Sequence, residues 1–373
     1  MTDRHLTFSS LLPGAVLLLL LSAQPALAGA RAGDVYVLSN QTTGNSVMVY
    51  HRDAGGALSF SGSFATGANG AGSGADPLGS QNPVVLADKG RLLLAVNAGS
   101  DSITAFRISG DTLTAADTVS SGGTMPVSLT VRHDLVYALN AGGTPNISGF
   151  TINRKTGKLF ALANATQPVP GGASSGPAEV AFDPNGGVLM VTETATNEID
   201  TFVLNPNGTP QAGVAFASSE PTPFGFTFRR GSRVAVVSDA EGGAAGASAL
   251  SSYKVGKSGN LDVITAGVGD TQTAACWVVV TRNGRFAYTS NTASNTISSY
   301  GVSGRGKLAL LDVTAGSGST PVDMGLTHSS RYLYARNAGD GSIFGFRVRP
   351  DGSLKPVASI GGLPDGAAGL AAD

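Results

Sequence analysis

The chain is poor in charge and in cysteine, and each shortage narrows what the protein can be. Only 13% of the 373 residues are charged and the formal net charge is −1, so we expect no basic field that would attract a nucleic acid or an anionic membrane. Cys276 is the single cysteine, which excludes an intrachain disulfide. We interpret it as a small buried hydrophobic residue and not as a nucleophile.

Long apolar runs are also missing, with one exception at the N-terminus. Arg4 and His5 precede a leucine-rich run from Leu11 to Leu21, which Ala26-Leu27-Ala28 follows. A charged start, a short apolar core and an A-x-A site are typical of a secretory signal peptide. An uncleaved anchor is the alternative, but the run is short for a membrane span. The sequence predicts a signal peptide at residues 1–28, one domain at 29–373, and a periplasmic or secreted protein.

Long stretches of helical periodicity are absent as well, and a repeat of strands takes their place. An apolar strand that ends in Asn, Asp or Glu recurs seven times, and successive ends are 43 to 57 residues apart. A repeat near fifty residues built only of strands is typical of a β-propeller. The fold class is therefore predicted as all-β, a seven-bladed propeller of four-stranded antiparallel blades. The strands are 35–40, 92–97, 135–140, 188–193, 234–239, 286–291 and 332–337.

The C-terminal end of the chain supplies the first strand that the N-terminal blade lacks. The first blade begins at its second strand, and the C-terminal segment after Pro364 is similar to a first strand with no second strand behind it. We predict that residues 366–371 pair with 35–40 and close the ring, which would remove two exposed sheet edges.

Two Gly-rich segments, 67–79 and 241–249, are interpreted as flexible surface loops.

Candidate site residues follow from the geometry of a blade. The start of the first strand and the end of the second strand lie on one face, around the central channel, so two rings of side chains should meet there. Acidic side chains, a cationic side chain and an aromatic ring at the opening of the channel are what a small polar ligand would need for binding. The first ring holds Asn40, Asn97, Asn140, Glu193, Asp239, Asn291 and Asn337, with Arg336 beside the last. The second ring holds Val85, Ser128, Glu179, Gly225, Trp277 and Asp323.

Each of these residues also has a structural interpretation. Asn and Asp at a strand end commonly bond the backbone of the following turn. Trp277 could plug the top of the channel, and Arg336 could serve only to pair with Asp323. His133 and His328 are placed in turns between first and second strands, on the face away from the acids, and His51 is placed after a third strand. We therefore expect neither a histidine metal site nor a Ser/His/Asp triad. No metal and no cofactor are predicted.

The segment from Gly176-Pro177-Ala178-Glu179 to Gly186, with Glu193 after it, resembles the seven-bladed lactonase family, which includes the propeller type of 6-phosphogluconolactonase and carboxymuconate cyclases. So does Asn97-Ala98-Gly99-Ser100-Asp101. Active relatives carry Gly-Pro-Arg-His at the start of this motif and a catalytic glutamate further on. The resemblance places that glutamate at Glu193, while Ala178 and Glu179 stand where the Arg and His would be.

Two functions from different classes remain open. The first is an exported hydrolase of a small lactone or cyclic ester, with Glu193 and Glu179 as acid and base and Arg336 as the group that polarises the carbonyl. Asp239, Trp277, Asp323, Asn291 and Asn337 would bind the ligand. The second is a binding propeller without turnover, with a small polar ligand or a protein as partner, similar to surface-layer propellers. In both cases we expect a monomer.

Overall fold

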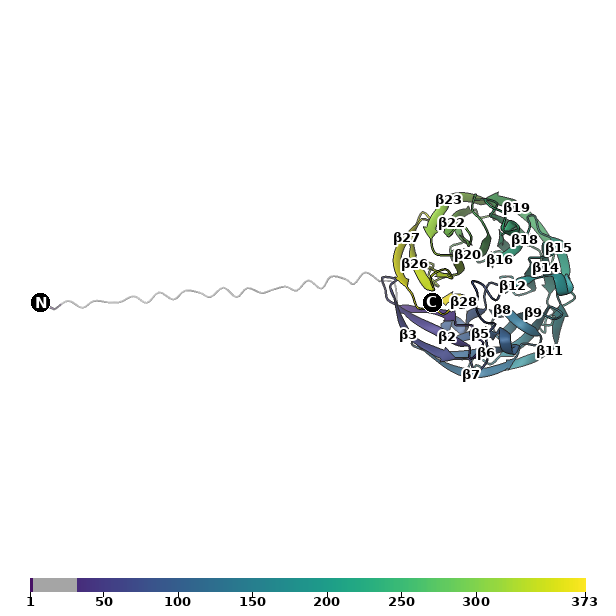
Figure 1. Cartoon of the computed structure of the whole chain (residues 1–373), viewed down its shortest axis with the longest axis horizontal. Helices are drawn as coiled ribbons and strands as arrows, with labels where there is room; N and C mark the ends of the chain where they lie inside the picture. The colour runs from purple at the N-terminus through teal and green to yellow at the C-terminus, as the bar shows by residue number, and fades with distance from the viewer. Residues whose placement is uncertain (3–31) are drawn as a thin grey trace.

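The computed structural model describes residues 1–2 and 32–373, and these residues form one ring of seven sheets (Figure 1). The predicted signal peptide, residues 1–28, lies outside the described residues except for Met1 and Thr2. Within the described part, no helix is long and apolar enough to cross a membrane.

Each blade is a four-stranded antiparallel sheet, as the sequence predicts. From the channel outward, blade one consists of β28 (Ala368–Ala372), β1 (Gly33–Leu38), β2 (Ser46–Arg52) and β3 (Leu58–Ala65). Blade two consists of β4 (Val84–Ala87), β5 (Leu92–Asn97), β6 (Ser102–Ser109) and β7 (Thr112–Ser120), and blade three of β8 (Thr124–Arg132), β9 (Leu135–Gly142), β10 (Asn146–Ile152) and β11 (Leu159–Pro168). Blade four consists of β12 (Pro177–Phe182), β13 (Val188–Glu193), β14 (Glu198–Val203) and β15 (Val214–Ala217), and blade five of β16 (Pro223–Phe228), β17 (Val234–Asp239), β18 (Ala249–Val255) and β19 (Leu261–Gly269). Blade six consists of β20 (Ala275–Val280), β21 (Phe286–Asn291), β22 (Thr296–Val302) and β23 (Leu308–Ser317), and blade seven of β24 (Pro321–Leu326), β25 (Tyr332–Asn337), β26 (Ser342–Val348) and β27 (Leu354–Ile360). Four single-turn 3-10 helices lie between strands: η1 (Asp88–Gly90), η2 (Ala98–Ser100), η3 (Gly172–Ser174) and η4 (Glu241–Gly243).

The second strand of a blade is buried on both faces because a neighbouring blade packs against each side. All six residues of β5, Leu-Leu-Leu-Ala-Val-Asn, are buried, and the same holds for β13, β17, β21 and β25. A strand covered on both faces needs a nearly continuous apolar run and not strict alternation. This is the pattern that made the repeat visible in the sequence.

Tyrosines on the second strands connect neighbouring blades. The hydroxyl of Tyr334 donates to the Gly56 carbonyl of blade one (2.8 Å), and Tyr288 and Tyr137 reach the corresponding glycines of their next blades, Gly352 and Gly208. Gly56 has a φ of +97°, and a Cβ there would lie 2.5 Å from the ring of Tyr332. The packing of blade seven against blade one therefore requires glycine at this position.

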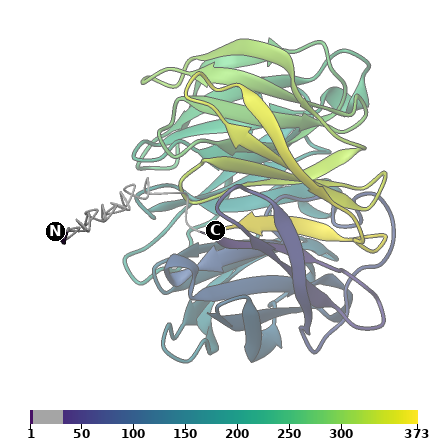
Figure 2. The same cartoon turned by 90° about the vertical axis from the view of Figure 1, so that its left-hand side faces the viewer.

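The ring closes as predicted. β28 pairs antiparallel with β1, and the partners are Val35 with Ala372, Tyr36 with Ala371 and Leu38 with Ala368. The C-terminal strand thus supplies the innermost strand of blade one, and the sheet order is β28-β1-β2-β3. The yellow strand beside the purple ones in Figure 2 is this contact between the two ends of the chain.

The disc has two faces that differ in their connections. We call the face where first strands begin and second strands end the loop face, because the long connections between blades lie there. The opposite face, with the turns from first to second and from third to fourth strands, is the turn face. Both the C-terminus and the start of the described propeller lie on the turn face (Figure 2).

Candidate functional site

The amides that end the second strands bond within their own blades. Asn97 Nδ2 donates to Ser102 Oγ (3.2 Å) and Thr104 Oγ1 (2.9 Å), and Asn291 makes the same two bonds to Thr296 and Ser298. Asn337 Nδ2 donates to Ser342 Oγ in the same way (3.2 Å). All three amides are fully buried. The sequence predicted bonds to the backbone of the turn, but these bonds are to side-chain hydroxyls at the start of the third strand. Asn291 and Asn337, which were predicted as ligand-binding residues, make the same bonds within their own blades.

Glu193 occupies the same position in blade four and is also held by its own blade. Its Oε1 accepts from Gly171 N (2.8 Å) and its Oε2 from Thr196 Oγ1. Asp200 stands seven residues further on, where other blades have Thr104 or Ser298. Burial raises the pKa of Asp200 to about 9, with a further contribution from Glu193. Asp239, the acid at this position in blade five, is fully buried, and burial raises its pKa well above its ordinary value.

Glu179 and Glu193 do not share contacts, although both lie on blade four. Glu179 pairs with Thr192 across the sheet, and a bulge between Pro177 and Glu179 shifts the register. Because side chains alternate along a strand, Glu193 points to the sheet face opposite to that of Thr192 and Glu179. Glu179 accordingly reaches blade five and the channel, whereas Glu193 faces the loop that precedes β12.

The Gly-rich segment 67–79 was predicted to be a flexible surface loop, and that prediction was wrong for residues 75–79, whereas Gly67, Asn69, Ser73 and Gly74 are exposed. The connection between β3 and β4 turns into the central channel, where residues 75–82 contact blades three to seven. We call these residues the plug. Gln81 Nε2 donates to the carbonyls of Phe226 (3.2 Å) and Val278 (3.1 Å), and Gln81 Oε1 accepts from Val278 N (3.0 Å). The Gln81 side chain therefore completes backbone bonds that the inner strands β16 and β20 leave unmade.

Further contacts of the plug lie on blades three and four. Gln81 N donates to the carbonyl of Ala178 (3.1 Å), and Ser80 Oγ donates to that of Val127 (2.7 Å). Glycine makes the approach to the channel possible, because a Cβ at Gly70 would lie 2.2 Å from the backbone of Asn40. One signal in the sequence could have revealed the plug: the step from Asn40 to Asn97 is the longest in the repeat.

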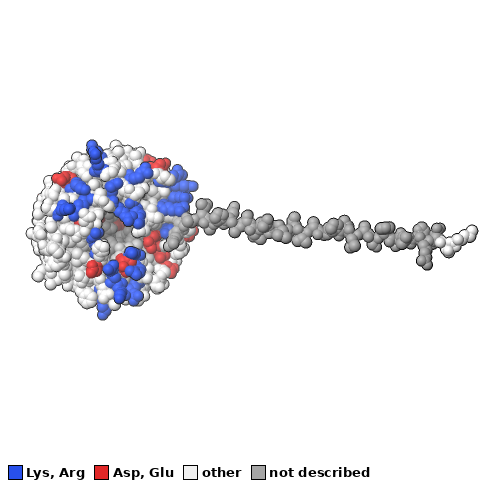
Figure 3. Space-filling view, turned by 180° about the vertical axis from the view of Figure 1, so that it is seen from behind, with Lys and Arg blue, Asp and Glu red and all other residues white. Residues whose placement is uncertain are grey.

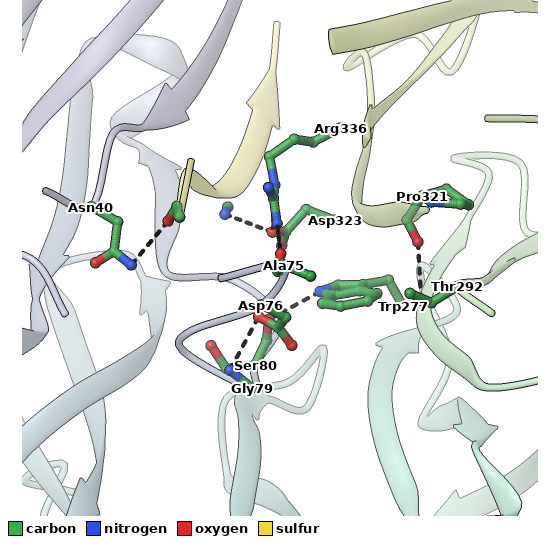
Figure 4. A network of polar contacts seen from close by, with 12 residues as sticks. Asn40, Ala75, Asp76, Gly79, Ser80, Trp277, Thr292, Pro321, Asp323 and Arg336 are labelled. Carbon is green, nitrogen blue, oxygen red and sulfur yellow. Dashed lines mark hydrogen bonds and ion pairs between the residues drawn. The ribbon is translucent and has the colours of Figure 1, made fainter. Parts of the chain in front are cut away.

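Arg336, Asp323 and Trp277 do come together, and they hold the plug. Arg336 Nη2 donates to the Ala75 carbonyl (2.9 Å), and its Nε lies 3.6 Å from Asp323 Oδ2. Trp277 Nε1 donates to the Ser80 carbonyl (3.0 Å). Figure 4 shows the plug enclosed by these side chains. They are almost fully buried, so in this arrangement they face the chain itself and not a ligand.

Asp323 also connects the plug to the ring closure. Its Oδ2 accepts from Gly369 N of β28 (2.7 Å), and Asn40 Nδ2 donates to the Gly366 carbonyl (3.1 Å). Asp76 lies within the plug, where Gly79 N donates to its Oδ1 (3.1 Å). Burial raises the pKa of Asp323 to about 6 and that of Asp76 to about 7, while burial lowers the pKa of Arg336.

These two pKa values predict a dependence of stability on pH. An acid whose pKa is raised by folding binds more protons in the folded than in the unfolded chain between about 4 and its folded pKa. The free energy of unfolding should therefore fall as the pH rises through 6 and 7. We expect a higher melting temperature at pH 5 than at pH 8, measured by calorimetry, and a smaller difference for Asp76→Asn.

Other buried acids with raised pKa values, such as Asp200, act in the same direction. The exposed Asp262 provides the control, and Asp262→Asn should leave the difference between pH 5 and pH 8 unchanged. A melting temperature that falls on acidification, as for a fold held by ionised carboxylates, would contradict the assignment.

Beneath the plug the central channel is hollow. A cavity of about 380 Å³ is lined by the inner strands and by Gln81 and Asn82, and Glu179 is the only ionisable residue in its lining. Asn82 Nδ2 donates to Glu179 Oε1 (2.6 Å) and Phe226 N donates to its Oε2 (2.5 Å). Burial raises the pKa of Glu179 well above its ordinary value, which favours the neutral carboxyl.

The channel opens on the turn face. The cavity shares Leu86, Leu326 and Ala372 with a second hollow of about 730 Å³ at that face. The wall of this outer hollow includes His133 and His328, which lie on the turn face as the sequence predicts. A ligand would thus reach Glu179 from the side opposite to the predicted mouth. Among residues 32–373, no cluster of three or more His, Cys, Asp and Glu side chains could hold a metal ion.

A closed ring of seven four-stranded blades with one plugged end defines the class of protein, a seven-bladed β-propeller with a blind central channel. The family model described as "Lactonase, 7-bladed beta-propeller" matches residues 4–174 and 249–362. The chain belongs to this family. The matched ranges leave out residues 175–248, which hold Glu179, Glu193 and Asp239, so the match carries no information on these three acids. No curated protein matches the sequence.

Solved structures share the fold at low identity. One is a putative 6-phosphogluconolactonase from Bacteroides uniformis, with 18% identity, a TM-score of 0.67, and coverage of 91% of this chain and 98% of that one. Another is a periplasmic gluconolactonase from Pseudomonas aeruginosa, with 17% identity, a TM-score of 0.67, and coverage of 90% and 98%. A protein from Lactobacillus plantarum has 19% identity, a TM-score of 0.68, and coverage of 91% and 98%. At these identities the likeness extends to the fold alone.

Proposed function

We propose that the protein is an exported hydrolase of the lactonase family that opens a small lactone at the blind end of its central channel. One observation carries the proposal: the Glu179 carboxyl lies at the end of a cavity that holds no other ionisable group and that opens to solvent on the turn face. A carboxyl with a perturbed pKa in a concave site is the usual sign of acid–base chemistry. The apolar core of the N-terminal segment supports export.

Hydrolysis of a lactone needs proton transfer at the ring oxygen and at the attacking water. In the proposed reaction a water molecule adds to the acyl carbon while the bond from that carbon to the ring oxygen breaks. The neutral Glu179 gives its proton to the departing ring oxygen and then takes one from the added water, which leaves a hydroxy acid. Asn82 and Phe226 N fix the carboxyl through their two hydrogen bonds.

Glu193 and Arg336 act in this proposal as positioning residues. Glu193 holds the Gly171 amide in the loop that leads to β12, the strand that carries Glu179. Arg336 binds the plug through the Ala75 carbonyl, and the plug supplies Asn82. Their loss should therefore weaken the reaction through the placement of Glu179 and not through the chemical step.

The experiment is hydrolysis of a panel of small lactones, including an aldonolactone, followed as acid release above the uncatalysed rate. We expect turnover by the wild-type protein and a decrease in kcat/KM of about 10²- to 10⁴-fold for Glu179→Gln. Asp262→Asn, which changes an exposed acid outside the cavity, should keep the wild-type rate and serves as the control. Glu193→Gln should lower the rate by no more than about tenfold, because Glu193 only positions the strand that carries Glu179. Equal rates for wild type and Glu179→Gln, or a wild type that matches the uncatalysed reaction, would refute the proposal.

A binding protein without turnover is the second candidate. Both Glu179 oxygens already accept hydrogen bonds from the chain, and no second acid or base lines the cavity. In that case a lactone or sugar acid should raise the melting temperature of the wild type but not of Glu179→Gln, with no acid released.

A further inference from the structure

Positive charge is segregated on one face of the disc. Apart from Arg336, every Lys and Arg between residues 32 and 373 lies in a turn of the turn face or in a strand end next to one. Examples are Lys89 in the turn after β4, Arg154 in the turn after β10, and Arg305 in the turn after β22. In Figure 3 the Lys and Arg side chains surround the hollow in the middle of this face.

Within residues 32–373 the loop face has no cation other than Arg336, whereas acids occur on both faces; Asp53, Asp88 and Asp134, for example, lie in turns of the turn face. Glu220 and Glu241 lie on the connections around β16 and β17 at the loop face, and the buried acids of the plug and the second strands lie at the same end of the blades. The net charge of −1 is therefore the sum of two unlike faces. Our expectation from the sequence that the protein has no basic field was drawn from that sum, and the arrangement of charges overturns it.

Six cations of the basic face line a groove between blades six and seven. It has a volume of about 860 Å³ and no acid in its lining. The cations come from turns far apart in the sequence, because each blade contributes its own turn to the same place. They are Arg230, Arg282, Arg331, Arg347, Arg349 and Lys355, which we call the groove cations.

The groove cations have no carboxylate partners within the described part of the chain. Other arginines of the same face are paired: Arg233 Nε lies 2.9 Å from Asp183 Oδ2, and Arg91 Nη2 lies 2.8 Å from Asp88 Oδ2. No such ion pair involves a groove cation. Asp351, in the turn from β26 to β27, accepts from Ser353 N (3.0 Å) and Oγ (2.8 Å). These bonds and, to a smaller extent, the charge of Arg349 lower the pKa of Asp351, so Arg349 has one carboxylate nearby that is not within ion-pair distance. Six like charges around one hollow repel each other, and an anion that enters the hollow would relieve the part of this repulsion that solvent does not screen.

The composition of the groove indicates what that anion is like. Five of the six cations are arginines, whose planar guanidinium binds phosphate, sulfate or carboxylate through two parallel hydrogen bonds. Phe286, the one aromatic residue in the lining, is buried and lies beneath Arg285. No exposed ring is therefore offered for stacking on nucleic acid bases. The volume is that of a small-molecule site.

We propose that this groove binds a compact polyanion, a small molecule with three or more phosphate, sulfate or carboxylate groups close together. The groove shares Arg230 and Arg282 with the outer hollow at the channel mouth, but it shares no residue with the cavity that contains Glu179. Polyanion binding in the groove therefore does not depend on lactone hydrolysis at Glu179. The surrounding basic face increases the rate at which such an anion arrives.

The test is calorimetric titration at low salt with inorganic tripolyphosphate, compared with orthophosphate and citrate. We expect tripolyphosphate to bind at least tenfold more tightly than orthophosphate, and its affinity to fall with added salt. The citrate arm shows whether carboxylates serve as well as phosphates. Arg331→Gln/Arg347→Gln should lower the affinity for tripolyphosphate at least tenfold.

The matched control is Lys254→Gln/Lys257→Gln, which removes the same charge from the same face outside the groove. It should change the affinity less than threefold, and circular dichroism should confirm that both double variants are folded. Equal losses in the two variants would overturn the groove as the site and leave only a diffuse basic face. The proposal would also be overturned if tripolyphosphate did not bind, or if only long polymers such as heparin or single-stranded DNA bound.

Discussion

Deletion of residues 364–373 is expected to lower the melting temperature by about 10 °C or more. The deletion removes β28, the inner strand of blade one, and exposes the edge of β1 along the channel. It also removes the buried side chain of Leu370 and the Asp373 carbonyl, to which Arg52 Nη2 donates (2.8 Å). Each backbone hydrogen bond contributes about 1 kcal/mol, and 1 kcal/mol shifts the melting temperature of a domain of roughly 200 residues by about 2–4 °C.

The measurement is thermal unfolding followed by circular dichroism, with a chain that starts at Ala32 as the control. That control keeps every contact of β28 and should melt like the full chain. An unchanged melting temperature for the C-terminal deletion would show that the ring is not held by this strand.

Replacement of Arg336 by Met should destabilise the fold by about 3–5 kcal/mol, because it leaves the buried Asp323 without its cation. The Ala75 carbonyl of the plug loses its donor as well. The effect should be smaller at pH 5 than at pH 8, since Asp323, with a pKa of about 6, is protonated at the lower pH. Urea unfolding at the two pH values measures both effects.

The double variant Arg336→Met/Asp323→Asn separates the charge from the rest of the contacts. Removal of both charges should recover a large part of the lost stability, because no uncompensated buried charge remains. The role given to this pair would be contradicted if Arg336→Met were as stable as the wild type. It would also be contradicted if the double variant lost the sum of the stabilities that the two single variants lose.

The fold could be read from the sequence because its signals are local and repeated. The run from Leu92 to Val96 is apolar because both of its faces are covered, and the second strands of the other six blades repeat an apolar run that ends in one to three polar residues. Ring closure was readable for the same reason: the segment after Pro364 matches the first strand that blade one lacks, and β28 confirms it.

The site could be read only in part, because its determinants are not local. The sequence correctly grouped Arg336, Asp323 and Trp277, since all three follow from repeat positions, but no pattern indicates that the plug fills the space between them. Gln81 satisfies backbone groups more than 140 residues away, which no short-range signal encodes. The bulge after Pro177 likewise separates Glu179 from Glu193, although the repeat places both residues at the channel mouth.

The same limit applies to charge. Net charge and composition are sums over the chain, whereas Arg230 and Arg349 become neighbours of one groove only when the blades close into a ring. Once the turns are assigned to faces, the segregation of charge follows from the sequence directly.

The most direct test of the account is an experimental structure of Glu179→Gln grown with a lactone that the wild type hydrolyses. This variant should retain the ligand because the proton donor is missing. The account predicts the lactone in the cavity beneath the plug, with its ring oxygen within hydrogen-bond distance of residue 179 and the plug in place. A lactone bound instead on the loop face, against Arg336 and Asp323 with residues 75–82 displaced, would contradict it.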